Sequence, residues 1–357
     1  GGSTAVDCSD LQADDFDAYP TTDDALRALH QSISDLAAAC SNKVGAYLQQ
    51  LGSMNVVRDM DEIRRAMGED KLNFIGYSYG TRLAGLYLQT YPQHSGRIVL
   101  DGSVLPDSAL TPLVTESLPA MQSNLRLFLS QCTNTDPGCS VDQLIARLTD
   151  RVEALRNDNN DASQVEFDVL GELVVLSTQE PDFGLFAADA VIEYLNSYDV
   201  AVLERFTQLL DALDEDMDDD DSDSETAQTA VMCADDAYRP TADDLITLLA
   251  QMNNLSDPFA EAQIGLAGLC AGWPQAVEPL APIATSTAPL SIVIGGTTDA
   301  QTPVQWSETM AQAIGGTYIR SEHTGHTVVF TDQSECVDDL VEQFLLDGLA
   351  PTVTQCN

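Results

Sequence analysis

The sequence predicts an α/β fold in which a mostly parallel sheet is flanked by helices and interrupted by a long helical insertion. Short apolar strands alternate with helical segments near the amino end, and the same rhythm returns near the carboxyl end. Between them lie helical stretches separated by Pro, Gly and acidic residues. We therefore expect a first part of the sheet core at residues 1–104, a helical cap at 105–282 and the last part of the core at 283–357.

The first part of the core is expected to alternate helices and strands. Residues 54–67 place apolar side chains at helical spacing and are followed by Gly68, which suits a helix C-cap. Residues 71–75 form a short apolar strand, residues 81–90 an apolar helix and residues 97–100 a second strand. This order is typical of parallel strands joined by crossover helices.

The last part of the core repeats the pattern. Residues 290–294 form an apolar strand that runs into a Gly-rich turn. Thr302 and Pro303 then suit the N-cap and the first position of a helix, with Gln305 placed as a capping-box partner. A last strand is expected at residues 317–320.

The charge of the chain is strongly negative. Its 57 Asp and Glu face 15 Lys and Arg, which gives a formal net charge of −42. Such a surface repels phosphates, so we expect no nucleic-acid partner, and no stretch is apolar enough for membrane insertion. The charge suits salty surroundings, and attraction of cationic substrate ends is the alternative. The acidic segment at residues 214–225 is expected to be a solvated loop.

Eight cysteines are dispersed along the chain. No Cys-x-x-Cys pair occurs and no Cys and His cluster has zinc-like spacing, so we expect no metal. An even, dispersed set favours disulfides and therefore a secreted or extracytoplasmic location. Proximity in sequence suggests four pairs, which are Cys8 with Cys40, Cys132 with Cys139, Cys233 with Cys270, and Cys336 with Cys356.

The candidate nucleophile is Ser78, within the pattern Gly76-x-Ser78-x-Gly80. This pattern lies between a predicted strand and a predicted helix, the setting of a nucleophile elbow. The two glycines are expected because the turn is too sharp for side chains near the strand and helix that it joins. The backbone N–H of Tyr79 would be one oxyanion donor.

A serine nucleophile needs a base and a carboxylate that orients the base. In the α/β-hydrolase type of fold the order along the chain is Ser, acid, His, and Asp299 and His326 follow successive predicted strands in that order. His323 shares the loop, but Gly325 beside His326 favours His326. His326 would take the Ser78 proton while Asp299 holds the imidazole, a chemistry that requires no cofactor.

Several motifs together resemble the secreted tripeptidyl aminopeptidase branch of the prolyl-aminopeptidase-type α/β-hydrolases. The likeness lies in Gly-Tyr-Ser78-Tyr-Gly-Thr, in Tyr91-Pro92 and in Arg97-Ile-Val-Leu-Asp-Gly102, and it spans most of the chain. Its further motifs are Cys233-Ala-Asp235, Cys270-Ala-Gly-Trp-Pro274, Asp299 with Thr302-Pro303, Gly325-His-Thr327, Cys336 and Cys356. The resemblance implies hydrolysis of peptides near a free amino terminus, outside the cytosol, with a helical cap over the site.

The chain departs from this family at its amino end. A Gly-Gly-Pro-Gly-Gly-like oxyanion loop and an Arg-Gly-x-Gly-x-Ser segment are expected upstream, and Gly1-Gly2-Ser3 resembles only the end of the latter. We therefore expect the N-terminal strands and a second oxyanion donor to be absent. Loss of one donor typically costs about 10² to 10³ in turnover.

The leading hypothesis is a serine exopeptidase whose cap carboxylates capture the ammonium group of a peptide substrate. Asp235 and Asp236 are the candidates, and solvated surface carboxylates are the alternative. Two other functions remain open. One is an esterase or lipase-like hydrolase with the same triad, and the other is a catalytically incomplete fragment that binds ligands. The sequence indicates no particular oligomeric state.

Overall fold

The computed structural model describes residues 6, 8, 11, 19–104, 110–158, 160–179, 181–214, 222–255, 260–278, 280, 282–284 and 290–357. Gly1-Gly2-Ser3 and residues 215–221 of the acidic segment lie outside this set. The chain forms two compact units. The helical unit comprises Gly1–Leu48, Met121–Cys233 and Tyr238–Pro274, and the sheet unit comprises Gln49–Ala120, Ala234–Ala237 and Gln275–Asn357.

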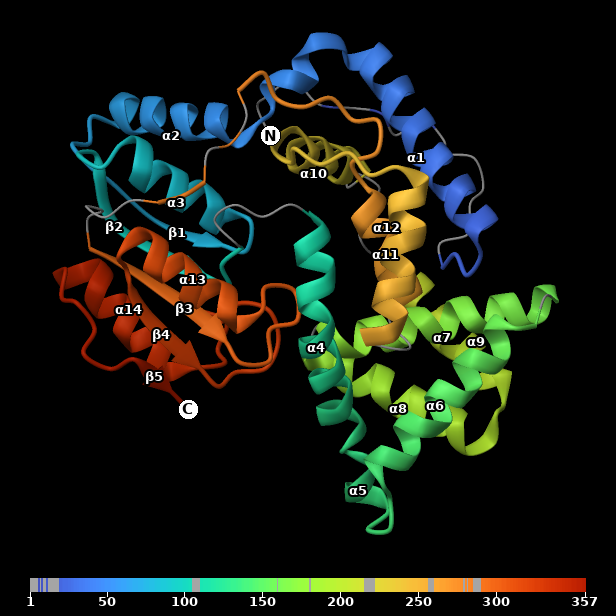
Figure 1. The fold of residues 1–357 in the computed structure, drawn as a ribbon. Coiled ribbons are helices and arrows are strands. Elements are labelled where there is room, and N and C mark those ends of the chain that lie inside the picture. The colour runs from blue at the N-terminus through green and yellow to red at the C-terminus, as the bar shows by residue number, and fades with distance from the viewer. Residues whose placement is uncertain are drawn as a thin grey trace. The chain divides into compact units, whose positions relative to one another are not determined.

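The sheet unit contains five described strands in the order β1-β2-β3-β4-β5, and every neighbouring pair is parallel. The strands are β1 Leu72–Tyr77, β2 Ser95–Asp101, β3 Ser291–Gly296, β4 Thr317–Ser321 and β5 Gln355–Cys356 (Figure 1). Because the strands are parallel, their carboxyl ends lie along one edge of the sheet, and the loops that leave this edge can meet. This arrangement confirms the predicted α/β-hydrolase type of fold.

Helices cover both faces of the sheet (Figure 1). Helices α2 Ser53–Met67, α3 Gly80–Thr90 and α13 Val304–Ile314 pack on one face, and α14 Glu335–Asp347 packs on the other. Alternate strand residues serve the two cores: Ile98 and Leu100 of β2 join the first, whereas Val99 joins the second. Burial of both faces explains why these strands are continuous apolar runs in the sequence.

The helical unit is built from one segment that precedes β1 in the sequence and two segments that lie between β2 and β3. Its described helices lie between residues 23 and 268, and α4 and α10 also contribute residues to the sheet unit. They are α1 Asp23–Val44, α4 Leu110–Leu129, α5 Cys132–Thr135, α6 Val141–Arg156, α7 Asp161–Gln179, α8 Pro181–Ser197, α9 Val200–Asp214, α10 Ser222–Asp235, α11 Ala242–Leu255 and α12 Ala260–Gly268. A short 3₁₀ helix, η1, spans Gly45–Gln50.

Two local features differ from the sequence analysis. Residues 1–48, which the sequence grouped with the sheet core, belong to the helical unit, where Arg27 of α1 forms an ion pair with Asp243 of α11 (2.7 Å). The acidic segment is helical from Ser222 onward, where α10 begins. The division into a core and a functional cap stays a prediction.

All four disulfides are present in the predicted pairing, which is Cys8–Cys40, Cys132–Cys139, Cys233–Cys270 and Cys336–Cys356. The last of these ties α14 to β5, so it closes the second core of the sheet unit. Such cross-links stabilise a fold chiefly by restricting the unfolded chain.

Among the helices of the described ranges, none combines the length and the apolar character that crossing a bilayer needs.

Candidate active site

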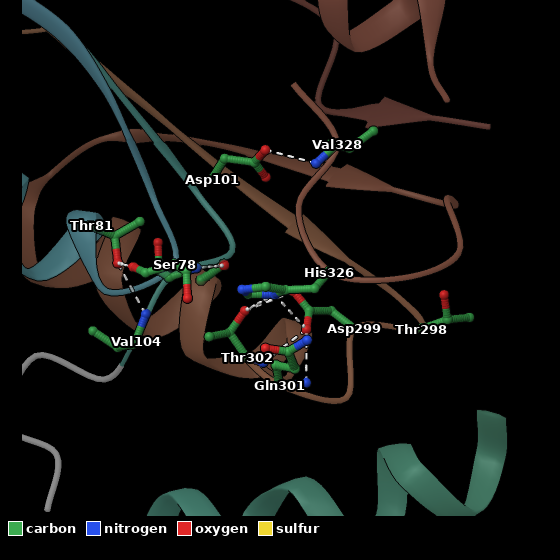
Figure 2. A network of polar contacts seen from close by, with 12 residues as sticks. Ser78, Thr81, Asp101, Val104, Thr298, Asp299, Gln301, Thr302, His326 and Val328 are labelled. Carbon is green, nitrogen blue, oxygen red and sulfur yellow. Dashed lines mark hydrogen bonds and ion pairs between the residues drawn. The ribbon is translucent and has the colours of Figure 1, made fainter. Parts of the chain in front are cut away.

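Ser78 lies in the sharp turn between β1 and α3 (Figure 2). Its φ of 51° falls in the left-handed region, which is costly for a residue other than glycine. Two hydrogen bonds hold this conformation: the Ser78 N–H donates to the Asp101 carbonyl oxygen (2.9 Å), and Thr81 Oγ1 donates to the Ser78 carbonyl oxygen (2.6 Å). Strain at this point, held by the residues around it, is the geometry of a nucleophile elbow.

The two glycines of the elbow differ in what the fold requires of them. A Cβ on Gly76 would lie 2.5 Å from the carbonyl oxygen of Gly80, which is backbone and cannot move aside easily. A Cβ on Gly80 would meet no described atom within 4 Å. The expectation that both glycines are sterically needed is therefore wrong for Gly80. The constraint is on Gly76, where β1 passes against the start of α3.

Asp299, which is buried, and His326, whose side chain is partly buried, form a pair in the loops after β3 and β4. The distance from His326 Nδ1 to Asp299 Oδ2 is 2.9 Å, and to Oδ1 it is 3.1 Å. Asp299 is 1% exposed, and its Oδ1 also accepts hydrogen bonds from the N–H groups of Gln301 (2.9 Å) and Thr302 (2.8 Å). A carboxylate fixed in this way can orient an imidazole and stabilise its charged form.

Ser78 and His326 both contact residues at the carboxyl end of β2. The Ser78 N–H donates to the carbonyl oxygen of Asp101, and the His326 ring lies beside the next residue. The residue after Asp101 is Gly102, where a Cβ would lie 3.2 Å from His326 Cε1 and 3.0 Å from Thr302 Oγ1. The φ of Gly102 is 63°, so the fold needs glycine here both for its conformation and for the close approach of the ring. In Figure 2 the His326 ring lies between Asp299 and Ser78. The three candidate residues thus share one edge of the sheet.

Thr302 contributes to the pair in a way that the sequence analysis missed. Its hydroxyl donates to Asp299 Oδ2 (2.7 Å) and lies 3.3 Å from His326 Nδ1. The prediction that Thr302 caps the following helix is wrong, because α13 begins at Val304 with Pro303 at the N-cap and no side-chain cap. The spacing Asp299-x-x-Thr302 could have predicted this contact. An Asp side chain in a turn often accepts hydrogen bonds from the backbone N–H and the hydroxyl of a residue that follows it closely in the sequence.

His323, the alternative base, occupies a different environment. Its ring is 5% exposed and packs against the backbone of Gly296, where a Cβ would lie 2.3 Å from the His323 ring. Burial lowers the pKa of His323. The structure pairs Asp299 with His326 and leaves His323 as a packing residue beneath the loop.

The candidate oxyanion donor Tyr79 is linked to Asp235. The Tyr79 hydroxyl donates to Asp235 Oδ2, and Asp235 Oδ1 accepts from the Ser53 N–H (2.8 Å) at the start of α2. Burial, reinforced by the Asp235 charge, raises the pKa of Tyr79, so the phenol stays protonated. Asp235 and Asp236 are 8% and 5% exposed. The alternative that both are solvated surface carboxylates is therefore wrong, and Asp235 contacts Tyr79, the residue that follows the nucleophile.

The described residues contain no group of three or more His, Cys, Asp or Glu side chains arranged to hold a metal ion. The chemistry available at the site is that of a serine hydroxyl, an imidazole and an orienting carboxylate.

Comparison with known proteins gives the family. A family model described as TAP-like protein matches residues 257–356, the segment that carries Asp299 and His326. Serine protease Hip1 of Mycobacterium tuberculosis is 25% identical over 373 aligned residues, and Carboxylesterase B of the same organism is 31% identical over 367. Each alignment covers 96% of this chain and 69% of the relative.

A third relative matches a shorter segment. Tripeptidyl aminopeptidase of Streptomyces lividans is 36% identical over 110 residues, which are 30% of this chain and 20% of the relative. Together with the parallel sheet, the strained elbow and the match to Carboxylesterase B over most of both chains, these likenesses identify the family. The chain belongs to the tripeptidyl aminopeptidase-like (TAP-like) branch of the α/β-hydrolase serine peptidases.

Proposed function

We propose that the chain is a secreted serine exopeptidase that cleaves peptides near a free amino terminus, with Ser78, Asp299 and His326 as its catalytic triad. The observation that carries this proposal is the hydrogen-bonded pair of Asp299 and His326 at the sheet edge where Ser78 occupies its strained turn. The four disulfides support a location in an oxidising compartment outside the cytosol.

The reaction follows from the positions of the hydrogen-bonding groups. Nδ1–H of His326 donates to Asp299, which leaves Nε2 as the acceptor for the Ser78 proton. Ser78 Oγ forms a bond to the carbonyl carbon of the peptide, and the Tyr79 N–H donates to the oxyanion. His326 then returns the proton to the leaving amine as the C–N bond breaks. A water molecule, deprotonated by the same imidazole, hydrolyses the acyl-enzyme and restores Ser78.

The amino-end preference rests on the carboxylates near the elbow. Because the Tyr79 hydroxyl donates to Asp235, an ammonium group bound beside Asp235 would lie near the reaction centre. A carboxylate there would attract the charged end of a peptide and repel its carboxylate end. The relative named tripeptidyl aminopeptidase supports this preference. Asp236, the neighbouring buried carboxylate, is proposed as part of the same subsite.

Paired peptide substrates test the amino-end claim. We expect an unblocked peptide to be cleaved with a kcat/KM at least about 10² higher than its N-acetylated form, since acetylation removes the charge that the carboxylates would bind. Asp235→Asn should raise KM for the unblocked peptide and leave cleavage of the acetylated form unchanged. Equal cleavage of both peptides by the unmodified chain would remove the exopeptidase claim while leaving the triad intact.

An esterase is the second candidate function, and the relative named Carboxylesterase B favours it. The same triad would attack an ester carbonyl, and an ester has a better leaving group than an amide. Turnover of short acyl p-nitrophenyl esters is therefore expected under either proposal. Ester turnover with no cleavage of any peptide would favour the esterase.

A further inference from the structure

Asp101, the last residue of β2, is a buried carboxylate that the proposed reaction does not use. It is 0% exposed, and its Oδ2 accepts a hydrogen bond from the N–H group of Val328 (2.7 Å; Figure 2) and another from the N–H group of Val329 (2.8 Å). No described residue donates a hydrogen bond to its Oδ1. The two donors follow His326 by two and by three residues, respectively. The carboxylate therefore holds the loop that carries the candidate base.

This loop needs an external hold because its backbone is strained. Thr327 and Phe330 have φ values of 64° and 58°, in the left-handed region that a β-branched or bulky residue adopts at a cost. Strained conformations of this kind persist only where surrounding contacts enforce them. The two N–H groups bound by Asp101 lie between these strained residues. Without the carboxylate, the loop would relax and carry the His326 ring with it.

The backbone of Asp101 contacts the other half of the site. Its carbonyl oxygen accepts the Ser78 N–H (2.9 Å), the bond that holds the nucleophile elbow. Gly102, the next residue, forms the surface against which the His326 ring lies. One strand end therefore fixes the nucleophile through its main chain and the loop of the base through its side chain.

We infer that Asp101 is a positioning residue that sets the His326 imidazole in register with Ser78. This inference rests on the proposed triad. Asp101 touches neither substrate nor a reacting atom, and its role is to fix where the loop after β4 leaves the sheet. The chemical requirement is an acceptor oxygen at the position of Oδ2.

Ionisation of the Asp101 carboxyl costs folding free energy, so its charge does not stabilise the fold. Burial raises the pKa of the carboxyl to about 6, although the hydrogen bonds from Val329 and Val328 oppose the rise. A carboxyl whose pKa is higher in the folded protein costs folding free energy as pH rises toward that pKa, and the cost is absent below the unfolded value. Of the two ionisable groups near it, a negative charge on Asp299 raises the pKa of Asp101 and a positive charge on His326 would lower it. Perturbed buried carboxyls of this kind occur preferentially at functional sites.

The test compares two substitutions at Asp101 with a matched control. Asp101→Ala removes both acceptors, whereas Asp101→Asn keeps an amide oxygen that can accept both N–H groups. Asp61→Asn changes another buried carboxylate of the sheet unit, which binds Arg64 in α2 and lies outside the site. For each folded variant we would measure kcat and KM on an unblocked peptide and the rate of fluorophosphonate labelling of Ser78.

We expect Asp101→Ala to lower both kcat and the labelling rate by about 10², with KM within about threefold, because a displaced base slows the chemical step and not binding. Asp101→Asn should recover most of the loss, and Asp61→Asn should leave kcat and labelling unchanged. If Asp101→Ala does not fold, Asp101→Thr takes its place. The hydroxyl oxygen of threonine lies closer to the backbone than Oδ2 and would not reach the two N–H groups, so the expected result is the same.

Two outcomes would overturn the positioning role while the proposed function stood. The first is wild-type labelling of folded Asp101→Ala or Asp101→Thr. The second is an equal loss in Asp101→Asn and Asp101→Ala, which would assign the effect to charge instead of the acceptor. If the unmodified chain is not labelled at Ser78, the proposed function fails and the positioning role falls with it.

Discussion

Replacement of Asp299 by Asn is expected to lower kcat by about 10⁴ while the chain stays folded. The reason lies in how the carboxylate is held. Oδ1 of Asp299 accepts the N–H groups of Gln301 and Thr302, so an amide oxygen would take that position. The amide NH₂ would then replace Oδ2 and donate toward His326 Nδ1. The imidazole would be forced into the tautomer with its proton on Nε2, which cannot accept the Ser78 proton.

Asp332→Asn is the matched control for Asp299→Asn. Asp332 is exposed, lies in the loop after β4 and has a φ of 63°, a conformation that asparagine adopts readily. Its kcat should equal that of the unmodified chain. Steady-state kinetics on an ester and on an unblocked peptide would measure both variants. A kcat within about tenfold of the unmodified value for folded Asp299→Asn would exclude Asp299 as the orienting acid.

Gly76→Ala is expected to have the second large effect, by distorting the nucleophile elbow. The new methyl group would lie 2.5 Å from the Gly80 carbonyl oxygen, so β1 and the start of α3 would have to separate. We expect a loss of about 1–3 kcal/mol in the free energy of unfolding from this overpacking. We also expect at least about a 10²-fold fall in kcat, because Ser78 would move relative to His326.

Gly80→Ala provides the control, since it makes the same chemical change four residues later. Gly80 is the first residue of α3, and its Cβ would meet no described atom within 4 Å. Replacing a helical glycine with alanine should raise the free energy of unfolding by up to about 1 kcal/mol and leave kcat unchanged. Thermal unfolding would compare the stability of Gly76→Ala with that of Gly80→Ala, and steady-state kinetics would compare their kcat values. Equal behaviour of the two would contradict the steric account of the elbow.

Much of the sheet unit could be predicted because its signals are local. The apolar run at residues 290–294 and the strand before Ser78 lie within a residue or two of β3 and β1. Buried parallel strands are continuously apolar, and the glycines that end helices mark their limits. The placement of residues 1–48 could not be predicted in the same way. Pairing of α1 with α11 depends on contacts between segments about two hundred residues apart.

The candidate site could be predicted in part for the same reason. The Ser78, Asp299 and His326 hypothesis came from their order and from their positions after strands. The bond between Asp101 and the loop after His326 joins residues that are 227 positions apart and matches no short motif. Thr302 was assigned to a helix cap because its sequence setting suits one, and the carboxylate of Asp299 competes for its hydroxyl. In both cases the role of the residue depends on a hydrogen bond formed in the folded structure.

The most direct test of the proposed triad is fluorophosphonate labelling of the folded chain, with Ser78→Ala and His326→Ala as controls. We predict a covalent adduct on the peptide that contains Ser78, no adduct in Ser78→Ala and labelling at least about 10³-fold slower in His326→Ala. Absence of labelling in the folded, unmodified chain would contradict the account and favour a catalytically incomplete binding protein. Labelling that persists in Ser78→Ala would show that the nucleophile is a different residue.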